Sequence, residues 1–269
     1  MHLPSLGLLS AFQSLRPVGC GHLQVQPIAF FIQHNLARAP KGDVPSDLYS
    51  LDSDAFRALA EKLVQEFSFP EAKEVETIFP RFYHSLDRAG RPMYFASFSS
   101  FCAHTLLKVS SIDRLVSHHI RETEKLKRHR IPACNGNSDT RALAVLDLKN
   151  APFSQFLTIG MKLFYKFERI LDHYDDMYSH IILVNSPPLF VYSWNVFRRI
   201  VRERSANKIL ILGQDYHEEL KKFARSDDLP LEYGGSCRKC PGGCSVSDRG
   251  PWNHASDAQA WCFTERDKI

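Results

Sequence analysis

Residues 181–213 read IILVNSPPLFVYSWNVFRRIVRERSANKILILG, and this stretch decides the fold class. Residues 181–184 and 209–212 are short, continuous apolar runs rich in branched side chains. Such runs are typical of parallel strands that are covered on both faces of a sheet. A turn at 185–188 and an aromatic helix lie between the two runs. We therefore predict two parallel strands joined by a crossover helix.

The connecting helix has more apolar surface than one packed face needs, and a basic segment follows it. These residues are Phe190, Trp194 and Phe197, then Arg198, Arg199 and Arg202. A helix that is apolar nearly all round is either buried on both sides or in contact with lipid. The arginines at its end favour a membrane surface. An ordinary crossover helix with a solvated basic end is the alternative.

The composition indicates a globular protein whose cysteines are in the reduced, thiol form. The chain has 269 residues, enough for a sizeable core, and a formal net charge of +4. This charge permits attraction to anionic lipid and does not indicate nucleic acid as a partner. No apolar run is long enough to span a bilayer. Seven scattered cysteines favour an intracellular protein without a disulfide framework.

Three regions differ in character. Residues 1–50 form a poorly defined or disordered N-terminus, 51–253 a folded domain, and 254–269 a C-terminal tail. Residues 1–42 contain no Asp or Glu but do contain arginines and a lysine, a composition that resembles an organelle transit peptide. Disorder explains the same composition equally well.

Helical and strand periodicities alternate in the middle region. We predict helices at 54–67, 112–130, 153–171 and 216–223, and further strands at 92–98 and 142–148. Ser110 and Asp113 resemble a capping box at the start of the second helix. This alternation predicts an α/β fold with a mostly parallel sheet.

Catalytic motifs are scarce in this sequence. No Gly-x-Ser-x-Gly elbow, phosphate-binding loop or dinucleotide motif follows any predicted strand. His173, Asp176 and His180 are residue types that bind zinc, manganese or iron, so a metal-dependent hydrolase is one hypothesis. A polar helix end before a strand is the favoured interpretation, because no other His-Asp cluster supports a metal site.

A cysteine-bearing loop follows the last predicted strand and helix. Cys237 and Cys240 have the spacing of a zinc knuckle, and Cys244 lies close behind them. Cys262 and His254 lie further downstream, but the second pair is irregular and glycines interrupt the run. A structural loop with free thiols is therefore favoured, and a zinc site is the weaker candidate.

Several segments, taken in order and spacing, resemble the CRAL-TRIO lipid-binding family in its phosphatidylinositol/phosphatidylcholine transfer branch. They are FPRFYH at 79–84, DRAGRPMY at 87–94, RIPAC at 130–134, LDLK at 146–149, VNSP at 184–187, KILILG at 208–213, LPxxYGGSC at 229–237 and SDRGPW at 247–252. Each segment is a weak signal alone, but together they are specific. The resemblance covers roughly residues 67–252.

The resemblance implies a mostly parallel sheet that floors an apolar pocket, with helices around it and a mobile gate helix at 189–204. The pocket holds one phospholipid and no other cofactor. Proteins of this kind exchange lipid between membranes or present it to a lipid kinase, and they make or break no bond. We therefore expect a non-enzymatic, monomeric protein at Golgi or endosomal-type membranes of the cytoplasm, although the N-terminal segment leaves organelle import open.

The resemblance also implies site residues. Lys208, Ser205 and Asp176 occupy lipid headgroup positions, Gly235 a hinge position, and Arg198, Arg199 and Arg202 a membrane-facing basic position. The expected pocket and gate residues are Phe164, Phe167, Ile170, Tyr174, Phe190, Trp194, Phe197, Ala142 and Ala144. A lysine suits a phosphate as a flexible point charge. Apolar side chains suit acyl tails, since exposing each methylene costs about 0.8 kcal/mol.

Departures from the family pattern affect the choice of lipid. Members that bind phosphatidylcholine carry hydroxyl side chains where this chain has Ala142 and Ala144, and a serine where it has Ile170. We therefore expect phosphatidylcholine binding to be lost, while the protein either keeps phosphatidylinositol or holds another hydrophobic ligand, such as a sterol or an isoprenoid. The family's helical N-terminal lobe is not recognisable here. This absence supports one alternative, a membrane-recruitment module that transfers no lipid.

Overall fold

The structure, a computed structural model, describes residues 48, 51–134, 139–151, 161–174, 176–188, 190, 191, 194, 198, 203–240 and 242–253. All of them belong to one compact unit, Ala39–Ile269. The predicted N-terminal segment, the tail at 254–269 and most of the predicted gate helix lie outside the described residues. Within the described part, no helix has the length and apolar character that crossing a membrane requires.

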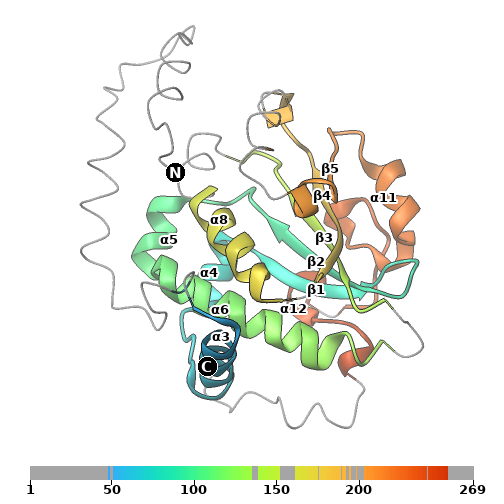
Figure 1. The fold of residues 1–269 in the computed structure, drawn as a ribbon. Coiled ribbons are helices and arrows are strands. Elements are labelled where there is room, and N and C mark those ends of the chain that lie inside the picture. Colours follow the sequence, from blue (N-terminus) through green and yellow to red (C-terminus); the bar gives the residue numbers. More distant parts are fainter. Residues whose placement is uncertain are drawn as a thin grey trace, which may run out of the picture. The chain divides into compact units, whose positions relative to one another are not determined.

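A five-stranded sheet in the order β1-β2-β3-β4-β5 organises the fold (Figure 1). The strands are β1 (Arg81–Leu86), β2 (Pro92–Ser97), β3 (Ala142–Asp147), β4 (Tyr178–Val184) and β5 (Ile209–Ile211). β1 and β2 form an antiparallel hairpin, and every later pair is parallel. The predicted α/β fold with a mostly parallel sheet is therefore confirmed.

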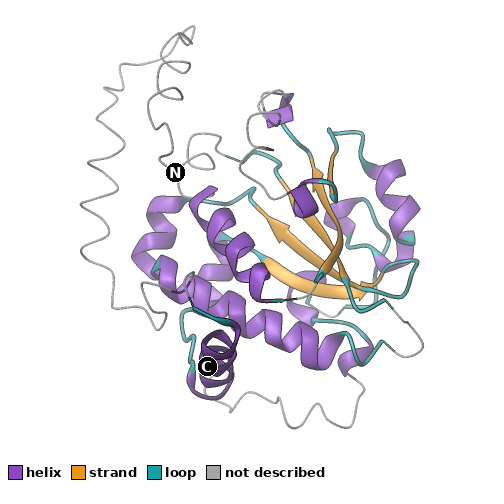
Figure 2. Cartoon of the chain, in the orientation of Figure 1, coloured by secondary structure: helices purple, strands orange, loops and turns teal. Residues whose placement is uncertain are grey.

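Helices pack on both faces of this sheet (Figure 2). The α-helices are α3 (Ser53–Glu66), α4 (Ala72–Ile78), α5 (Ala103–Val109), α6 (Ile112–Lys125), α8 (Met161–Ile170), α10 (Glu203–Ala206), α11 (His217–Phe223) and α12 (Cys244–Ser247). Shorter turns are the π-turn η2 (Leu126–Arg130) and the 3-10 turns η4 (Leu171–His173), η5 (Ser226–Asp228), η6 (Leu231–Tyr233) and η7 (Pro251–Asn253). The predicted helices at 112–130 and 216–223 correspond to α6 with η2 and to α11.

Two hydrophobic cores use the alternation of side chains along each strand. Ala144 and Ile181 face a larger core with the helices α3, α6 and α8, while Val145 and Ile182 face a smaller core with α11. Because both faces are covered, the central strands are apolar on both sides. This explains the continuous apolar runs in the sequence.

The start of α6 differs from the predicted capping box. Ser111, not Ser110, caps the helix, because its Oγ accepts a hydrogen bond from the Arg114 N–H at 3.2 Å. Ser110 instead donates its hydroxyl proton to the Glu71 carboxylate at 2.9 Å. Asp113 forms an ion pair with Lys166 of α8 at 3.6 Å, so its side chain links two helices.

The C-terminal segment returns to the outer strand β1. The Ser85 N–H of β1 donates to the Arg249 carbonyl at 2.6 Å, and the Arg88 N–H, just after β1, donates to the Phe223 carbonyl at the end of α11 at 2.7 Å. Trp252 is fully buried, and its Nε1 donates to the Asp248 carbonyl at 2.8 Å. The exposed edge of the sheet is therefore partly covered by the chain's own C-terminal residues.

Candidate functional site

Charged side chains gather at the edge of the sheet where β3, β4 and β5 begin. Arg141 precedes β3, Asp176 lies shortly before β4, and Lys208 precedes β5. Because these strands are parallel, positions before them meet at one edge. Lys208 Nζ forms an ion pair with the Asp176 carboxylate and donates to the Tyr178 carbonyl at 3.0 Å. Arg141 Nη1 lies 3.5 Å from the other Asp176 oxygen.

This arrangement brings together the three residues predicted for the headgroup. Lys208, Asp176 and Ser205 line one small cleft of about 20 Å³, which we call the charged notch. Sequence reasoning missed Arg141, although its position directly before a strand was a usable signal. Arg141 is also paired with Asp139, so two cations and two carboxylates meet beside the notch, and a lysine there suits a phosphate as a flexible point charge.

An apolar cavity adjoins the charged notch on the same face of the sheet. Leu171, Tyr178 and Ile181 line both spaces, so the two are neighbours that share part of a wall. The volume of the apolar cavity is about 90 Å³. Its remaining lining is almost entirely apolar or aromatic: Phe79, Tyr94, Ala96, Phe98, His119, Ala144, Leu146, Leu163 and Phe167. A space of this chemistry accommodates hydrocarbon rather than charge.

The predicted pocket residues divide between this cavity and the core. Ala144 and Phe167 line the apolar cavity. Ala142 and Ile170 are fully buried in the larger core and are not among the lining residues. Tyr174 is also buried, and its hydroxyl donates to the Glu124 carboxylate at 2.7 Å.

The predicted gate segment is described at only a few positions. The Phe190 and Trp194 rings lie 6.4 Å apart, and both pack against the larger core. Arg198 is exposed and donates to the Asn207 side-chain oxygen at 3.2 Å. The side chains of Phe164 and Phe197, and those of Arg199 and Arg202, lie outside the described residues.

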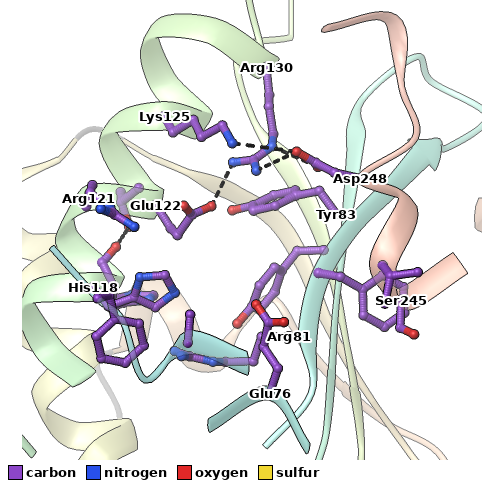
Figure 3. Close-up of a pocket in the computed structure, with 17 residues that line it drawn as sticks. Glu76, Arg81, Tyr83, His118, Arg121, Glu122, Lys125, Arg130, Ser245 and Asp248 are labelled. Atoms are coloured by element: carbon purple, nitrogen blue, oxygen red, sulfur yellow. Dashed lines mark hydrogen bonds and ion pairs between the residues drawn. The ribbon is translucent and has the colours of Figure 1, made fainter. Parts of the chain in front are cut away.

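A larger, polar cavity of about 300 Å³ continues from the apolar one towards β1 (Figure 3). Tyr94 and His119 line both cavities. The lining of the polar cavity includes seven charged residues: Glu76, Arg81, Arg121, Glu122, Lys125, Arg130 and Asp248. Arg81 Nε, His118 Nδ1 and His119 Nε2 are buried and have no hydrogen-bond partner among the described residues. Such a lining suits water or a polar group.

An ion-pair network closes one end of the polar cavity. Figure 3 shows Arg130 between two acids, with the Tyr83 ring against its guanidinium. Arg130 lies 3.1 Å from both Glu122 and Asp248, and its guanidinium carbon is 4.1 Å from the Tyr83 ring centre. Burial alone would raise the pKa of Glu122, but the charges of Arg130 and Lys125 outweigh it and lower this pKa. Glu122 is therefore ionised at neutral pH.

The predicted hinge residue, Gly235, lies in a tightly packed backbone turn. A Cβ atom at this position would lie 2.0 Å from the Leu229 carbonyl oxygen. The Gly235 N–H donates to the Pro230 carbonyl at 3.0 Å. Only glycine therefore fits here without a backbone shift.

The histidines and the aspartate of the hydrolase hypothesis do not converge within the described part of the chain. His173 stacks on Phe56 with ring centres 4.0 Å apart, and His180 contacts Phe223 edge-on at 5.1 Å. Asp176 pairs with Lys208 and Arg141 instead. These contacts match the favoured interpretation of a polar helix end before a strand.

The loop cysteines do converge. Cys237 and Cys244 are buried, Cys240 is partly exposed, and their sulfur atoms lie together beside the buried His84 of β1. None of these residues lines the three cavities. Sequence reasoning found the cysteines but missed His84, because this histidine is far from them in the chain.

Comparison with known proteins gives one family and several relatives. The family model for the CRAL/TRIO domain matches residues 79–235, more than half of the chain. The phosphatidylinositol/phosphatidylcholine transfer protein SFH11 of Arabidopsis thaliana is 32% identical over 194 residues, which are 70% of this chain and 52% of the relative. The Sec14 cytosolic factor of Schizosaccharomyces pombe is 29% identical over 194 residues, 71% of this chain and 68% of the relative.

The fold also matches a solved structure. The crystal structure of Sfh5 superimposes with a TM-score of 0.55 and 16% identity, over 79% of this chain and 69% of that chain. At this identity the likeness concerns the fold alone. The chain spans about half the length of the Arabidopsis relative and about two thirds of the fission-yeast one. From the family model, the motifs and the shared fold together, the protein belongs to the CRAL/TRIO domain family, with Sec14-like phospholipid transfer proteins as its relatives.

Proposed function

We propose that this protein binds one phospholipid, phosphatidylinositol in the first place, and moves it between membranes or presents it to a lipid kinase. The observation that supports this most directly is that the charged notch and the apolar cavity are neighbours, with Leu171, Tyr178 and Ile181 in the lining of both. An amphipathic ligand needs both environments side by side, with a few polar groups that fix its head.

The headgroup binds at the charged notch, where its phosphate takes the place of a carboxylate as an ion-pair partner. A lipid phosphate competes with the Asp176 carboxylate for Lys208, while Arg141 stays paired with Asp139 beside the notch. Ser205 lines the same notch, where its hydroxyl is suited to an inositol hydroxyl. In this proposal the lipid phosphate replaces the Asp176 carboxylate as the partner of Lys208.

The acyl tails require movement of the protein. The described apolar cavity, about 90 Å³, is smaller than the roughly 300–1,000 Å³ of ordinary ligand pockets. Leu163 and Phe167 of α8 form part of its wall, so α8 must shift outward before two tails enter. Exposed tails would cost about 0.8 kcal/mol per methylene, so exchange takes place in contact with a membrane.

Phosphatidylcholine is bound poorly in this proposal. Ala142 and Ala144 offer no hydroxyl group on β3, and Ile170 is fully buried in apolar surroundings. The phosphate of a phosphocholine head would lose its hydrogen bonds to water on entering this region, and these three side chains offer no donor in their place.

The test combines bound-lipid analysis with transfer assays. Mass spectrometry of organic extracts from the purified protein should find phosphatidylinositol at near one per chain. Lys208→Ala should lower phosphatidylinositol transfer between vesicles about 10- to 100-fold, because a hydrogen bond to a charged group contributes about 1.5–3 kcal/mol. Lys222→Ala is the matched control, since Lys222 is an exposed residue of α11 on the other face of the sheet. Phosphatidylcholine as the main lipid, or unchanged transfer by Lys208→Ala, contradicts the proposal.

The small volume of the apolar cavity favours one second candidate, a membrane-recruitment module without transfer. In that case the purified protein carries no lipid and moves none between vesicles, yet still cosediments with anionic vesicles. Cosedimentation and transfer measured on the same preparation separate the two functions.

A further inference from the structure

We propose that His84, Cys237, Cys240 and Cys244 bind one zinc ion in a closed, structural site that fastens the C-terminal segment to β1. One ligand atom from each of these residues lies within 4.8 Å of all the others. This inference does not depend on the proposed lipid function, because none of the four side chains lines a cavity described above.

The spacing of the ligand atoms fits tetrahedral zinc. Cys237 Sγ lies 3.9 Å from Cys240 Sγ, and Cys240 Sγ lies 3.9 Å from His84 Nδ1. With zinc–sulfur bonds of about 2.3 Å, tetrahedral geometry places two sulfur atoms about 3.8 Å apart. These two distances already fit, and the other pairs, at most 4.8 Å apart, need to close by no more than about 1 Å around the ion.

The loop between the second and third cysteines returns the chain to the cluster. Gly242 and Gly243 both have positive φ, +81° and +107°, a conformation that favours glycine. Cys244 follows at the first position of the short helix α12, where it is buried. The glycines that made the sequence spacing irregular thus shape the loop that brings Cys244 to the other three ligands.

His84 contributes the fourth ligand from the middle of β1. Its side chain is fully buried, and its Nδ1 points towards the sulfur of Cys240. Its Nε2 has no hydrogen-bond partner in the described part of the chain. A metal at Nδ1 would give this buried imidazole a strong bond, which the 3.9 Å contact with the Cys240 sulfur does not supply.

The strand backbone is irregular at this point. The pairing of β1 with β2 shifts between Tyr83 and Leu86, and the neighbouring Ser85 has a φ of +54°. Irregular pairing of this kind turns a side chain to a new direction. A non-glycine residue at positive φ costs free energy, which the surrounding contacts must offset.

Arg249 balances the charge of the proposed site. Three thiolates, one neutral imidazole and Zn²⁺ carry a net charge of about −1. Arg249 Nη1 lies 3.9 Å from Cys237 Sγ, within reach of a hydrogen bond to a thiolate. Outer groups of this type orient the ligands and stabilise the complex.

Four protein ligands leave no open coordination position, so the site is structural rather than catalytic. Soft thiolates with one imidazole favour zinc over magnesium or calcium. Binding joins a segment near the chain's C-terminal end to the outer strand of the sheet. Ser245 and Val246, directly after the last ligand, line the polar cavity, so the ion also holds part of that cavity's wall.

The experiment uses the full chain without an affinity tag, expressed in zinc-supplemented medium and purified under reducing conditions. Metal analysis by mass spectrometry should give about one zinc per chain. Replacement of zinc by Co²⁺ should produce the visible bands of tetrahedral cobalt and a thiolate charge-transfer band. This spectrum tests the site in the unmodified protein, so it does not depend on whether a variant folds.

Variants assign the ligands. Cys240→Ser should lower the zinc content at least fivefold and weaken the charge-transfer band, because Cys240 is the least buried of the three cysteines. Cys102→Ser is the matched control, since Cys102 is also partly exposed but lies outside the cluster, and its zinc content should stay at one. Zinc below about a tenth per chain without a tetrahedral cobalt spectrum, unchanged zinc in Cys240→Ser, or an intact mass that reveals a disulfide among these cysteines would overturn the proposal.

Discussion

His119 joins the apolar cavity to the polar one, and its ring stacks on Phe167 with centres 4.1 Å apart. Burial, together with the nearby charge of Arg81, lowers the pKa of His119 from 6.5 to about 3. The imidazole is therefore neutral in the folded protein at physiological pH. A single residue between the two cavities thus makes the stability of the folded protein depend on pH.

The sign of this dependence follows from the two pKa values. Between pH 6.5 and about 3 the unfolded chain binds a proton that the folded chain does not, so stability falls as the pH falls through this window. One such group contributes about 1.4 kcal/mol per pH unit. Urea unfolding at pH 7.5 and 5.5 should show that the wild type loses about 1 kcal/mol more than His119→Phe. Equal losses in the two proteins would contradict the lowered pKa.

At the scale of elements, strands were the most predictable part of the chain. Ile182, Val184 and their neighbours are apolar on both faces, and this pattern is visible in the sequence. The positions of Lys208 and Asp176 came from the family resemblance. Arg141 was missed although it directly precedes a predicted strand, whereas His84 could not be assigned, because a distant segment returns beside it and no local pattern encodes that return.

Arg130 links η2 to the C-terminal segment through its ion pair with Asp248, and this link should stabilise the fold. Arg130→Met should destabilise the protein by about 2–4 kcal/mol, because Glu122 and Asp248 lose their common partner in a partly buried site. Urea unfolding provides the measurement. Arg57→Met is the control: its ion pair with Asp54 is exposed, so the change should cost less than about 1 kcal/mol. Similar effects of the two substitutions would show that the network contributes little.

At the scale of the whole molecule, the three cavities follow one face of the sheet from β1 to β5. The polar cavity begins beside Arg81 and Tyr83 of β1, the apolar cavity crosses β2, β3 and β4, and the charged notch ends beside Lys208. Each space shares lining residues with the next. A ligand bound anywhere along this path therefore contacts several strands at once and stabilises the folded state as a whole.

Lipid binding should accordingly raise the thermal stability of the protein. A ligand at about 100 times its Kd adds about 2.7 kcal/mol. This corresponds to a Tm increase of about 5–10 °C for a domain of this size. Calorimetry with and without phosphatidylinositol vesicles measures the shift, and Lys208→Ala should reduce it strongly. A wild-type Tm that does not respond to this lipid would contradict binding along the path.

The cover of β1 by Arg249 and its neighbours has a consequence for biosynthesis. β1 and β2 leave the ribosome early, but Arg249, whose carbonyl accepts a hydrogen bond from the outer strand β1, is translated long afterwards. During that interval the growing chain carries an open strand edge, which is prone to pairing with other chains. Slow translation or premature termination before Arg249 should therefore lead to aggregation in the cell. Chaperones that bind nascent chains should reduce this aggregation by shielding the open edge of β1.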